Sequence, residues 1–314
     1  MRIFITGASG YVGSVVVEKA IAAGHEVSGL ARSQDSASKI QKMGATAVMG
    51  TLQDLDKLST AAAQADAVLH LGFVHEFDKP FEQLIDIDIA AIQSIGKALR
   101  GTGKPFISTA GTGVVMPDDG KETTEGSQPE GFPLSLRLKS EQAALAYASE
   151  GVRAIVIRLA PFVYGRGGSY FAPATIEASA KYGFAPYFGD GLQMTTTSDV
   201  DASAELYLLA MQKGKAGSVF NCSTQTDLRM RDLAEAIAEA LEVPAKSVDE
   251  NTIDEMVGQF VGRFLRVENR ASSAKARREL GWDPKPRFDL RKDIAHGSYQ
   301  PLVQSLRKQF LKSL

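Results

Sequence analysis

A strand, a glycine-rich turn and a helix open the chain, and they restrict its fold more than any other feature. The apolar run Ile3-Phe4-Ile5 is typical of a strand that is buried on both faces. The turn Gly7–Gly13 follows at once, with its glycines three residues apart. Residues 14–23 then carry apolar side chains at helical spacing, and a second apolar strand over 26–31 completes a βαβ unit.

The three glycines of this turn each meet a different steric demand. Gly7 permits a tight turn, Gly10 lets the backbone approach a pyrophosphate, and Gly13 lets the helix lie against the strand. The first amides of the following helix add hydrogen-bond donors and a partial positive charge. The turn therefore predicts a dinucleotide site; the alternative is that the glycines only pack the helix on the strand.

The end of the second strand bears on which dinucleotide binds. An acidic residue at this point usually holds the ribose 2′-hydroxyl of NAD. Here the strand ends in Arg32-Ser33, which offers a planar donor fork and a hydroxyl to a phosphate. We therefore expect NADP, while the nearby Asp35 keeps NAD open.

Strands and helices continue to alternate over the first half of the chain. Further strands are expected at 45–49, 67–71, 105–109 and 153–159, with helices at 54–65, 80–100 and 135–150. This alternation predicts an α/β fold with a Rossmann-type, doubly wound parallel sheet. Ligands of such sheets bind at the carboxyl ends of the strands, which here are Thr6-Gly7, Arg32, Thr51, Gly72-Phe73, Thr109-Ala110 and Pro161–Gly165.

The regular alternation breaks after Gly165. We expect residues 1–165 to form the NAD(P)-binding domain, which also receives later segments such as 190–222. Residues 166–314 then form mainly a smaller substrate-binding lobe, interleaved with the sheet. A hairpin-like turn is predicted at Gly189-Asp190-Gly191. The turn-rich loop 111–133 is interpreted either as a substrate lid or as a plain surface loop.

Composition excludes several other classes of protein. A net charge of -2 without a basic block argues against nucleic acid as a partner. No apolar stretch is long enough for a membrane helix, and the first residues already form a strand rather than a signal peptide. The single cysteine, Cys222, excludes an intrachain disulfide framework. No His, Asp or Glu pair shows ligand spacing, so we expect no metal, and a cytoplasmic setting fits.

Five stretches together resemble the short-chain dehydrogenase/reductase superfamily, in its extended, epimerase/dehydratase-like branch. The resemblance spans the chain to about Asp289, and its stretches are 6–13, 50–54, 68–73, 158–165 and 275–282. It implies a Rossmann domain that binds NAD(P) and a small lobe that closes over a small-molecule substrate. Members commonly pair through the helices that correspond to 80–100 and 135–150, which leaves a homodimer open.

The resemblance also assigns positions along the coenzyme. Thr51 is a departure, because the family usually has Asp there. The implied contacts are Gly7, Ser9, Gly10, Tyr11, Val12 and Gly13 at the pyrophosphate, Arg32 and Ser33 at the 2′-phosphate, Thr51 and Leu52 at the adenine, Leu71, Gly72 and Phe73 beside the ribose, Arg137 at the ribose or a phosphate, and Pro161 and Val163 flanking the nicotinamide.

The family's Tyr-x-x-x-Lys pair is not found at its expected place. In family enzymes the Tyr hydroxyl exchanges a proton with the substrate and the Lys lowers the pKa of that Tyr. If Glu141 matches the Glu that often follows the pair, Arg137 stands at the Lys position and Pro133 at the Tyr position. The other alignment puts Lys139 and Ser135 there. We prefer the first, because its distance to the next strand fits better.

The remaining candidates for catalysis are Thr109, Thr112, Arg137 and Tyr164. An ungapped match puts Ala110 at the family's upstream Ser position, between the two threonines. Arg137 stays charged and is a poor proton donor. Tyr164 has a competing interpretation as a wall or core residue. Substrate contacts are expected from Thr109, Tyr164 and His75, which lies just past a strand end.

Two functions follow from this pattern. The first is an NAD(P)-dependent oxidoreductase or epimerase/dehydratase-like enzyme that acts on a small carbonyl or hydroxyl substrate without the usual pair. The second is a non-catalytic NAD(P)-binding sensor or regulatory protein. The lid, the strand end beside the nicotinamide and the substrate lobe favour the enzyme, whereas the missing tyrosine favours the sensor.

Overall fold

Seven parallel strands form the main sheet of the computed structural model, which describes residues 1–75, 79–115, 121–128 and 136–311. The strand order is β10-β6-β5-β4-β1-β2-β3. The predicted doubly wound sheet is therefore confirmed, with the order expected of a Rossmann fold. The strands are β1 (Arg2–Thr6), β2 (Glu26–Ala31), β3 (Thr46–Met49), β4 (Ala67–His70), β5 (Pro105–Gly111), β6 (Arg153–Leu159) and β10 (Ser218–Cys222).

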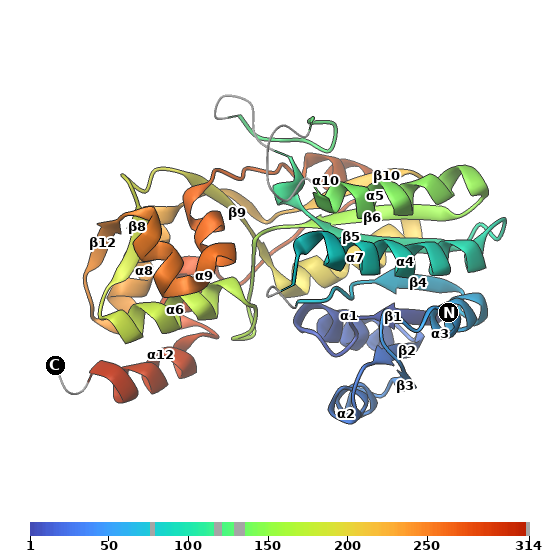
Figure 1. Cartoon of the computed structure of the whole chain (residues 1–314), viewed down its shortest axis with the longest axis horizontal. Helices are drawn as coiled ribbons and strands as arrows, with labels where there is room; N and C mark the ends of the chain where they lie inside the picture. Colours follow the sequence, from blue (N-terminus) through green and yellow to red (C-terminus); the bar gives the residue numbers. More distant parts are fainter. Residues whose placement is uncertain (76–78, 116–120, 129–135, 312–314) are drawn as a thin grey trace.

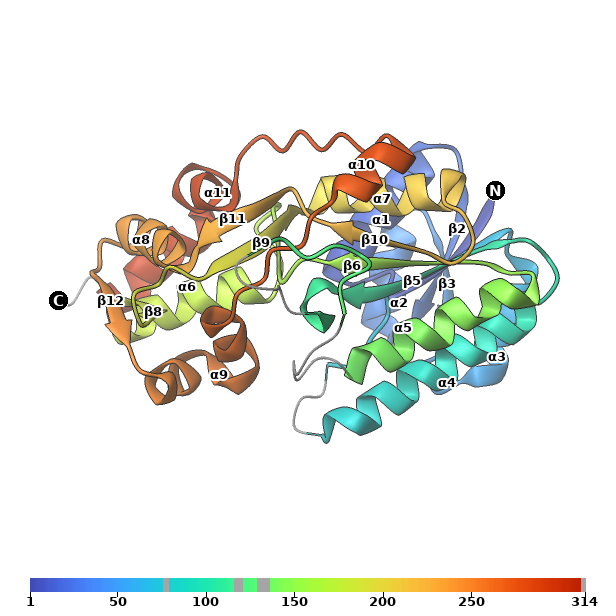
Figure 2. The same ribbon diagram turned by 90° about the horizontal axis from the view of Figure 1, so that it is seen from above.

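Helices cover both faces of this sheet (Figure 2). Side chains alternate along each strand, so Ile3 and Ile5 face one layer while Phe4 faces the other. The layer against Ile3 and Ile5 comprises α1 (Tyr11–Ala22), α2 (Gln34–Lys42), α7 (Val200–Lys213) and α10 (Ala274–Leu280). The layer against Phe4 comprises α3 (Leu55–Gln64), α4 (Phe81–Leu99) and α5 (Arg137–Ala146).

A second lobe lies beside the carboxyl ends of the main strands (Figure 1). Its own core includes Phe162, Tyr164, Ile176 and Ile237. Its strands are β7 (Phe162–Tyr164), β8 (Ala185–Phe188), β9 (Met194–Asp199), β11 (Gln225–Arg229) and β12 (Ala245–Val248). Its helices are α6 (Phe171–Tyr182), α8 (Met230–Leu241), α9 (Glu250–Arg266), α11 (Leu290–His296) and α12 (Gln300–Leu306), followed by a π-helical turn at Arg307–Leu311.

The predicted hairpin around Gly189-Asp190-Gly191 is wrong. The chain does turn there, but β8 pairs with β12 in parallel, and β9 lies between β7 and β11. Gly189 and Gly191 have φ of 59° and 69°, the left-handed backbone that glycine favours. Such turns occur in hairpins and in connections between strands that do not pair with each other. The Gly-Asp-Gly pattern therefore does not distinguish the two.

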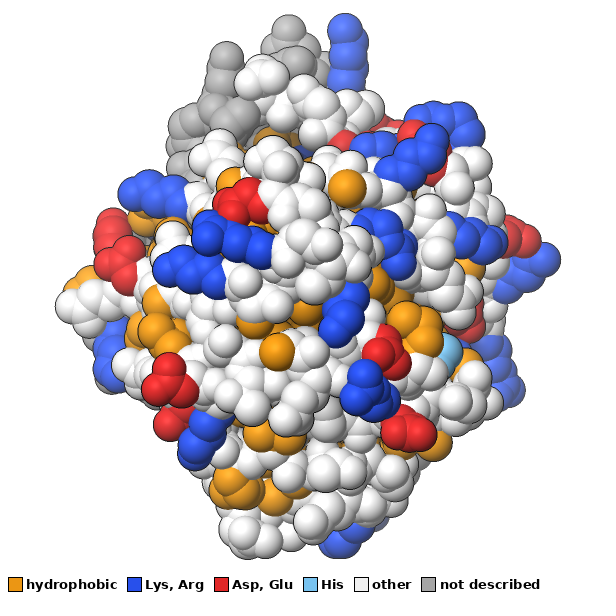
Figure 3. Space-filling model, turned by 90° about the vertical axis from the view of Figure 1, so that its right-hand side faces the viewer, with side chains coloured by type: hydrophobic (Ala, Val, Ile, Leu, Met, Phe, Trp, Pro, Cys, Tyr) orange, Lys and Arg blue, Asp and Glu red, His pale blue; other side chains and the backbone are white. Residues whose placement is uncertain are grey.

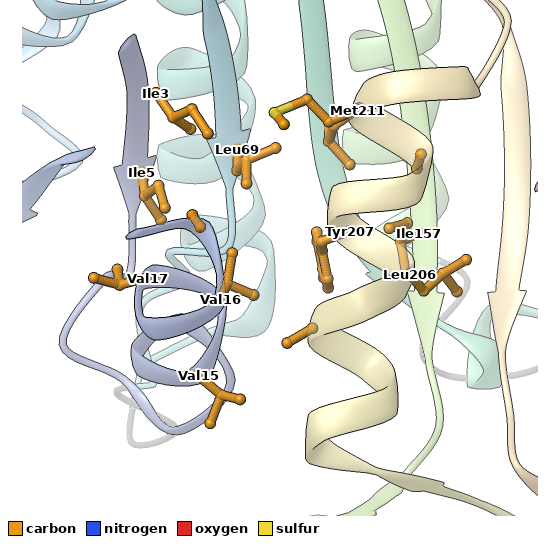
Figure 4. Close-up of a cluster of buried hydrophobic side chains, with 14 of the residues drawn as sticks. Ile3, Ile5, Val15, Val16, Val17, Leu69, Ile157, Leu206, Tyr207 and Met211 are labelled. Carbon is orange, nitrogen blue, oxygen red and sulfur yellow. The ribbon is translucent and has the colours of Figure 1, made fainter. Parts of the chain in front are cut away.

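Residues that follow β9 return to the first sheet. Helix α7 packs on α1, and β10 pairs with β6 at the edge of the sheet. Figure 4 shows Val16 of α1 and Tyr207 of α7 in one apolar layer against the strands. The helix α2 was not predicted from the sequence.

Candidate functional site

The glycine turn joins β1 to α1 with very little space. Gly7 has φ of 72°, and a Cβ there would lie 2.8 Å from the backbone of Leu71 and Gly72. A Cβ on Gly13 would lie 2.0 Å from the carbonyl oxygen of Gly7. Gly10 is the N-cap of α1 and has no side chain to occupy the first amides. These amides are therefore available to a diphosphate at the helix N-terminus.

The tip of β2 presents Arg32 and Ser33, both exposed. Ser33 is the N-cap of α2, and its Oγ accepts a hydrogen bond from the amide of Ser36 at 3.2 Å. The N-terminus of this second helix therefore follows Arg32 directly in the chain. Both features favour an anion at this point.

Predicted adenosine contacts from three strand ends lie together next to the glycine turn. A Cβ on Gly72 would meet Thr6 Oγ1 at 3.0 Å and Leu52 Cδ2 at 3.3 Å. The amide and hydroxyl of Thr51 both donate to Asp54 Oδ2, at 2.7 and 2.9 Å. Asp54 thus supplies a carboxylate next to Thr51, where the family usually has Asp.

Arg137, at the start of α5, is fixed by contacts in three directions. Its Nη1 donates to Asp88 Oδ2 at 3.0 Å, and its Nη2 donates to the carbonyl of Thr109 at 2.8 Å. The ring of Phe73 lies 4.1 Å from the guanidinium carbon, a cation–π distance. The structure thus joins Arg137 to β5 and to the residues that follow β4. Lys139, the alternative, is exposed, and Pro133 and Ser135 lie outside the described residues.

Asp88 and His70 continue this network into the core. His70 Nε2 lies 3.1 Å from Asp88 Oδ1, and its Nδ1 lies 2.7 Å from Thr6 Oγ1, which accepts the amide of Gly72 at 3.0 Å. Burial alone would raise the pKa of Asp88, but Arg137 and His70 outweigh it and hold that pKa below the ordinary value. By the family resemblance, Asp88 stands where members often have a structural Asn.

A buried ion pair holds α5 on the sheet one turn beyond Arg137. Arg158 of β6 donates Nε and Nη2 to the two oxygens of Glu141, at 2.8 and 2.7 Å. Both side chains are about 95% buried, with 4% and 5% of their surface exposed. This bidentate contact fixes the rotation of α5 and hence the position from which Arg137 extends.

The three hydroxyl candidates for catalysis all bond to other groups of the protein. Thr109 Oγ1 donates to the carbonyl of His70 at 2.8 Å and lies 2.8 Å from the hydroxyl of Tyr207, a residue that the sequence did not single out. Thr112 donates to Asn269 Oδ1 at 2.9 Å. Tyr164 donates to the carbonyl of Phe288 at 2.7 Å, and burial raises its pKa. The geometry of Tyr164 favours its interpretation as a core residue.

His75 lies at the mouth of the site. It is exposed, and its ring makes an edge contact with Phe73, with 5.6 Å between centroids. Loss of surrounding water lowers the pKa of His75, and the cations Arg137 and Arg32 act in the same direction. Pro161 is half-buried and Val163 is buried in the main core.

Tyr11 connects the glycine turn to the second lobe. Its hydroxyl donates to the carbonyl of Gly165 at 2.6 Å, and burial raises its pKa. Ser9 and Val12, its neighbours in the turn, are half-buried. Within the described residues, no helix could span a membrane, and no group of three His, Cys, Asp or Glu could hold a metal.

The fold and the converging strand ends define a Rossmann-type protein of the short-chain dehydrogenase/reductase class. The model of the NAD dependent epimerase/dehydratase family matches residues 3–223. The chain therefore belongs to the NAD-dependent epimerase/dehydratase family, and the expected resemblance is confirmed. Its members are NAD(P)-dependent oxidoreductases, epimerases and dehydratases, which supports the expectation of an enzyme.

Individual relatives cover nearly the whole chain. An uncharacterized protein of Schizosaccharomyces pombe is 38% identical and covers 95% of this chain and 100% of its own. The 4-hydroxy-2-methyl-3-oxo-4-farnesyl-3,4-dihydroquinoline-1-oxide ketoreductase of Stigmatella aurantiaca is 24% identical over 90% of this chain and 92% of its own. The dTDP-glucose 4,6-dehydratase DesIV of Streptomyces venezuelae, solved with NAD bound, matches the fold with a TM-score of 0.78, 19% identity and 99% of both chains.

Proposed function

We propose that the protein is an NADP-dependent oxidoreductase or epimerase-like enzyme that acts on a small carbonyl or hydroxyl substrate. The observation that carries this proposal is the tip of β2. There Arg32 and the N-terminus of α2 lie together, and the strand ends without a carboxylate. This arrangement suits the 2′-phosphate of NADP better than the free hydroxyl of NAD.

Titration of the purified protein with NADPH and NADH tests this coenzyme preference. Trp282, the single tryptophan, is buried beside α7, so calorimetry is a more direct measurement than its fluorescence. We expect tighter binding of NADPH. Tighter binding of NADH would overturn the role proposed for Arg32.

Bound NADPH would supply a hydride to the carbonyl carbon of the substrate. The chain's own contribution is proposed to come from Arg137, whose guanidinium faces the coenzyme ribose and polarises the substrate oxygen. Arg137 stays protonated, so the proton for that oxygen must come from another group or from water. His75 is the titratable side chain proposed for this step, because its ring contacts Phe73 directly beneath Arg137.

Turnover is tested by following NADPH oxidation with a panel of aldehydes, ketones and enones. The ketoreductase relative supports ketones as the first members of that panel. We expect the wild type to oxidise NADPH with at least one carbonyl of the panel. The substitution His75→Gln should lower this activity and leave the affinity for NADPH unchanged.

One observation favours the second candidate, a coenzyme-binding sensor without turnover. The hydroxyls of Thr109, Thr112 and Tyr164 all bond to other groups of the protein. A protein that binds NADPH but is silent with every carbonyl of the panel would support the sensor.

A further inference from the structure

Asp88 is a carboxylate with 2% of its surface exposed, yet its surroundings keep it ionised. A buried carboxylate without partners would take up a proton instead, because its charge is costly away from water. Here Arg137 and His70 each contact one of its two oxygens, at 3.0 and 3.1 Å. The position of this charge on α4 is therefore fixed by partners on β4 and α5.

Arginine suits the position opposite Asp88 in a way that lysine does not. The planar guanidinium of Arg137 spans Asp88 on α4 and the Thr109 carbonyl on β5 with two different nitrogens. It also stacks on Phe73. A lysine ammonium is a single point of charge and cannot make this set of contacts together. Two of the five N–H groups of an arginine are used by these bonds, which leaves others for a ligand.

We propose that Asp88 is a positioning residue that holds the Arg137 guanidinium toward the nicotinamide ribose of the coenzyme. His70 of β4 contacts Asp88 in turn, and Thr6 of β1, the strand that precedes the glycine turn, contacts His70. This inference rests on the proposed function, because it needs a bound nicotinamide coenzyme. Beyond the proposed function, it states that Arg137 can bind the coenzyme only while Asp88 holds it in position.

This placement predicts a pattern of coenzyme affinities. The nicotinamide ribose is common to NADPH and NADH, whereas the 2′-phosphate belongs to NADPH alone. Loss of Asp88 therefore weakens the binding of both coenzymes by the same factor. Loss of Arg32 changes the ratio between them. A purely structural role for Asp88 changes neither affinity in protein that is still folded.

The experiment compares the dissociation constants of NADPH and NADH for the wild type, Asp88→Asn, Arg137→Lys and the double variant. We expect each single variant to weaken both coenzymes about tenfold, the scale of a lost hydrogen bond to a charged group. The double variant weakens them no further, because the two residues act as a unit. The matched control is Glu150→Gln, which breaks the exposed ion pair with Arg100 just beyond the end of α5 and should bind both coenzymes as the wild type does.

Several results overturn the proposal. One is wild-type affinity in folded Asp88→Asn protein, and another is additive losses in the double variant. A third is a loss in Glu150→Gln equal to that in Asp88→Asn, which would assign the effect to general destabilisation of the protein. If the wild type itself binds neither coenzyme, the proposed function fails and this inference fails with it. Failure of the Asp88 variants alone leaves the proposed function intact.

Discussion

The two ends of the proposed coenzyme site are built in different ways. The glycine end, defined as Gly7–Gly13 with Arg32 and Ser33, comes from one βαβ unit of consecutive residues. The arginine end, defined as Arg137 with its partners Asp88, His70, Thr109 and Phe73, draws on β4, the residues after it, α4, β5 and α5.

This difference separates backbone recognition from side-chain recognition. At the glycine end, helix amides and close approach carry the chemistry, so what matters is the absence of side chains. At the arginine end, a buried charge network carries it, so several side chains depend on one another. The side of the molecule away from the second lobe, at the right of Figure 1, shows interspersed basic and acidic side chains in Figure 3.

The arginine end depends on the ion pair that anchors α5 on the sheet. Loss of this pair should have the largest effect on stability. Glu141→Gln leaves Arg158 buried without a counter-charge, so we expect the free energy of unfolding to fall by about 3–5 kcal/mol. Urea denaturation measures this change. Glu150→Gln is the control: it breaks the exposed pair with Arg100 and should cost about 1 kcal/mol or less. Equal losses in both variants would mean that the buried pair does not anchor α5.

The glycine end should respond to a single added methyl group. Gly13→Ala places a Cβ 2.0 Å from the carbonyl of Gly7, so α1 must move away from β1. We expect coenzyme affinity to fall on the order of a hundredfold, the upper range of overpacking effects. Gly111→Ala, at the end of β5, is the control, since its Cβ would meet no described atom closer than 3.8 Å. Calorimetry measures the coenzyme affinity of both variants. An unchanged affinity in Gly13→Ala would contradict the requirement for close packing of α1 on β1.

Coenzyme discrimination should be confined to the glycine end. Arg32→Ala is expected to weaken NADPH about tenfold and to leave NADH nearly unchanged, because only the 2′-phosphate loses a charged donor. Lys39→Ala, an exposed change later on α2, serves as the control. Parallel titrations with both coenzymes measure the ratio. A similar loss of affinity for both coenzymes would contradict a contact between Arg32 and the 2′-phosphate.

Acid should affect the arginine end through Asp88, with a smaller effect. The pKa of Asp88 is held below its ordinary value of 3.8, so the unfolded chain binds this proton more readily than the folded one. The stability that the carboxylate contributes is therefore present above pH 4 or so and is lost as the pH falls through its folded pKa. Unfolding free energies at pH 6 and about pH 3.5 should differ less for Asp88→Asn than for the wild type. A steeper acid loss in the variant would contradict the ionised pair.

Local patterns predicted most of the first half of the fold. The strands around Ile3-Phe4-Ile5 and Arg153–Leu159 were located correctly, because apolar runs and glycine stops depend on neighbouring residues alone. The partner of β8 could not be predicted, because strand pairing depends on residues far apart in sequence. Tyr207 was missed for the same reason: its hydroxyl meets Thr109 only after α7 returns to the sheet.

The sequence by itself determined the nucleotide-binding topology, since glycine spacing and apolar periodicity act within one βαβ unit. Its preferred alignment also put Arg137 at the family's lysine position, with Lys139 as the alternative. Only the tertiary structure showed that the charge of Arg137 is paired with the buried carboxylate of Asp88. Asp88 and Arg137 are 49 residues apart along the chain, and a burial-dependent ion pair exists only once the strands and helices that exclude water have packed around it.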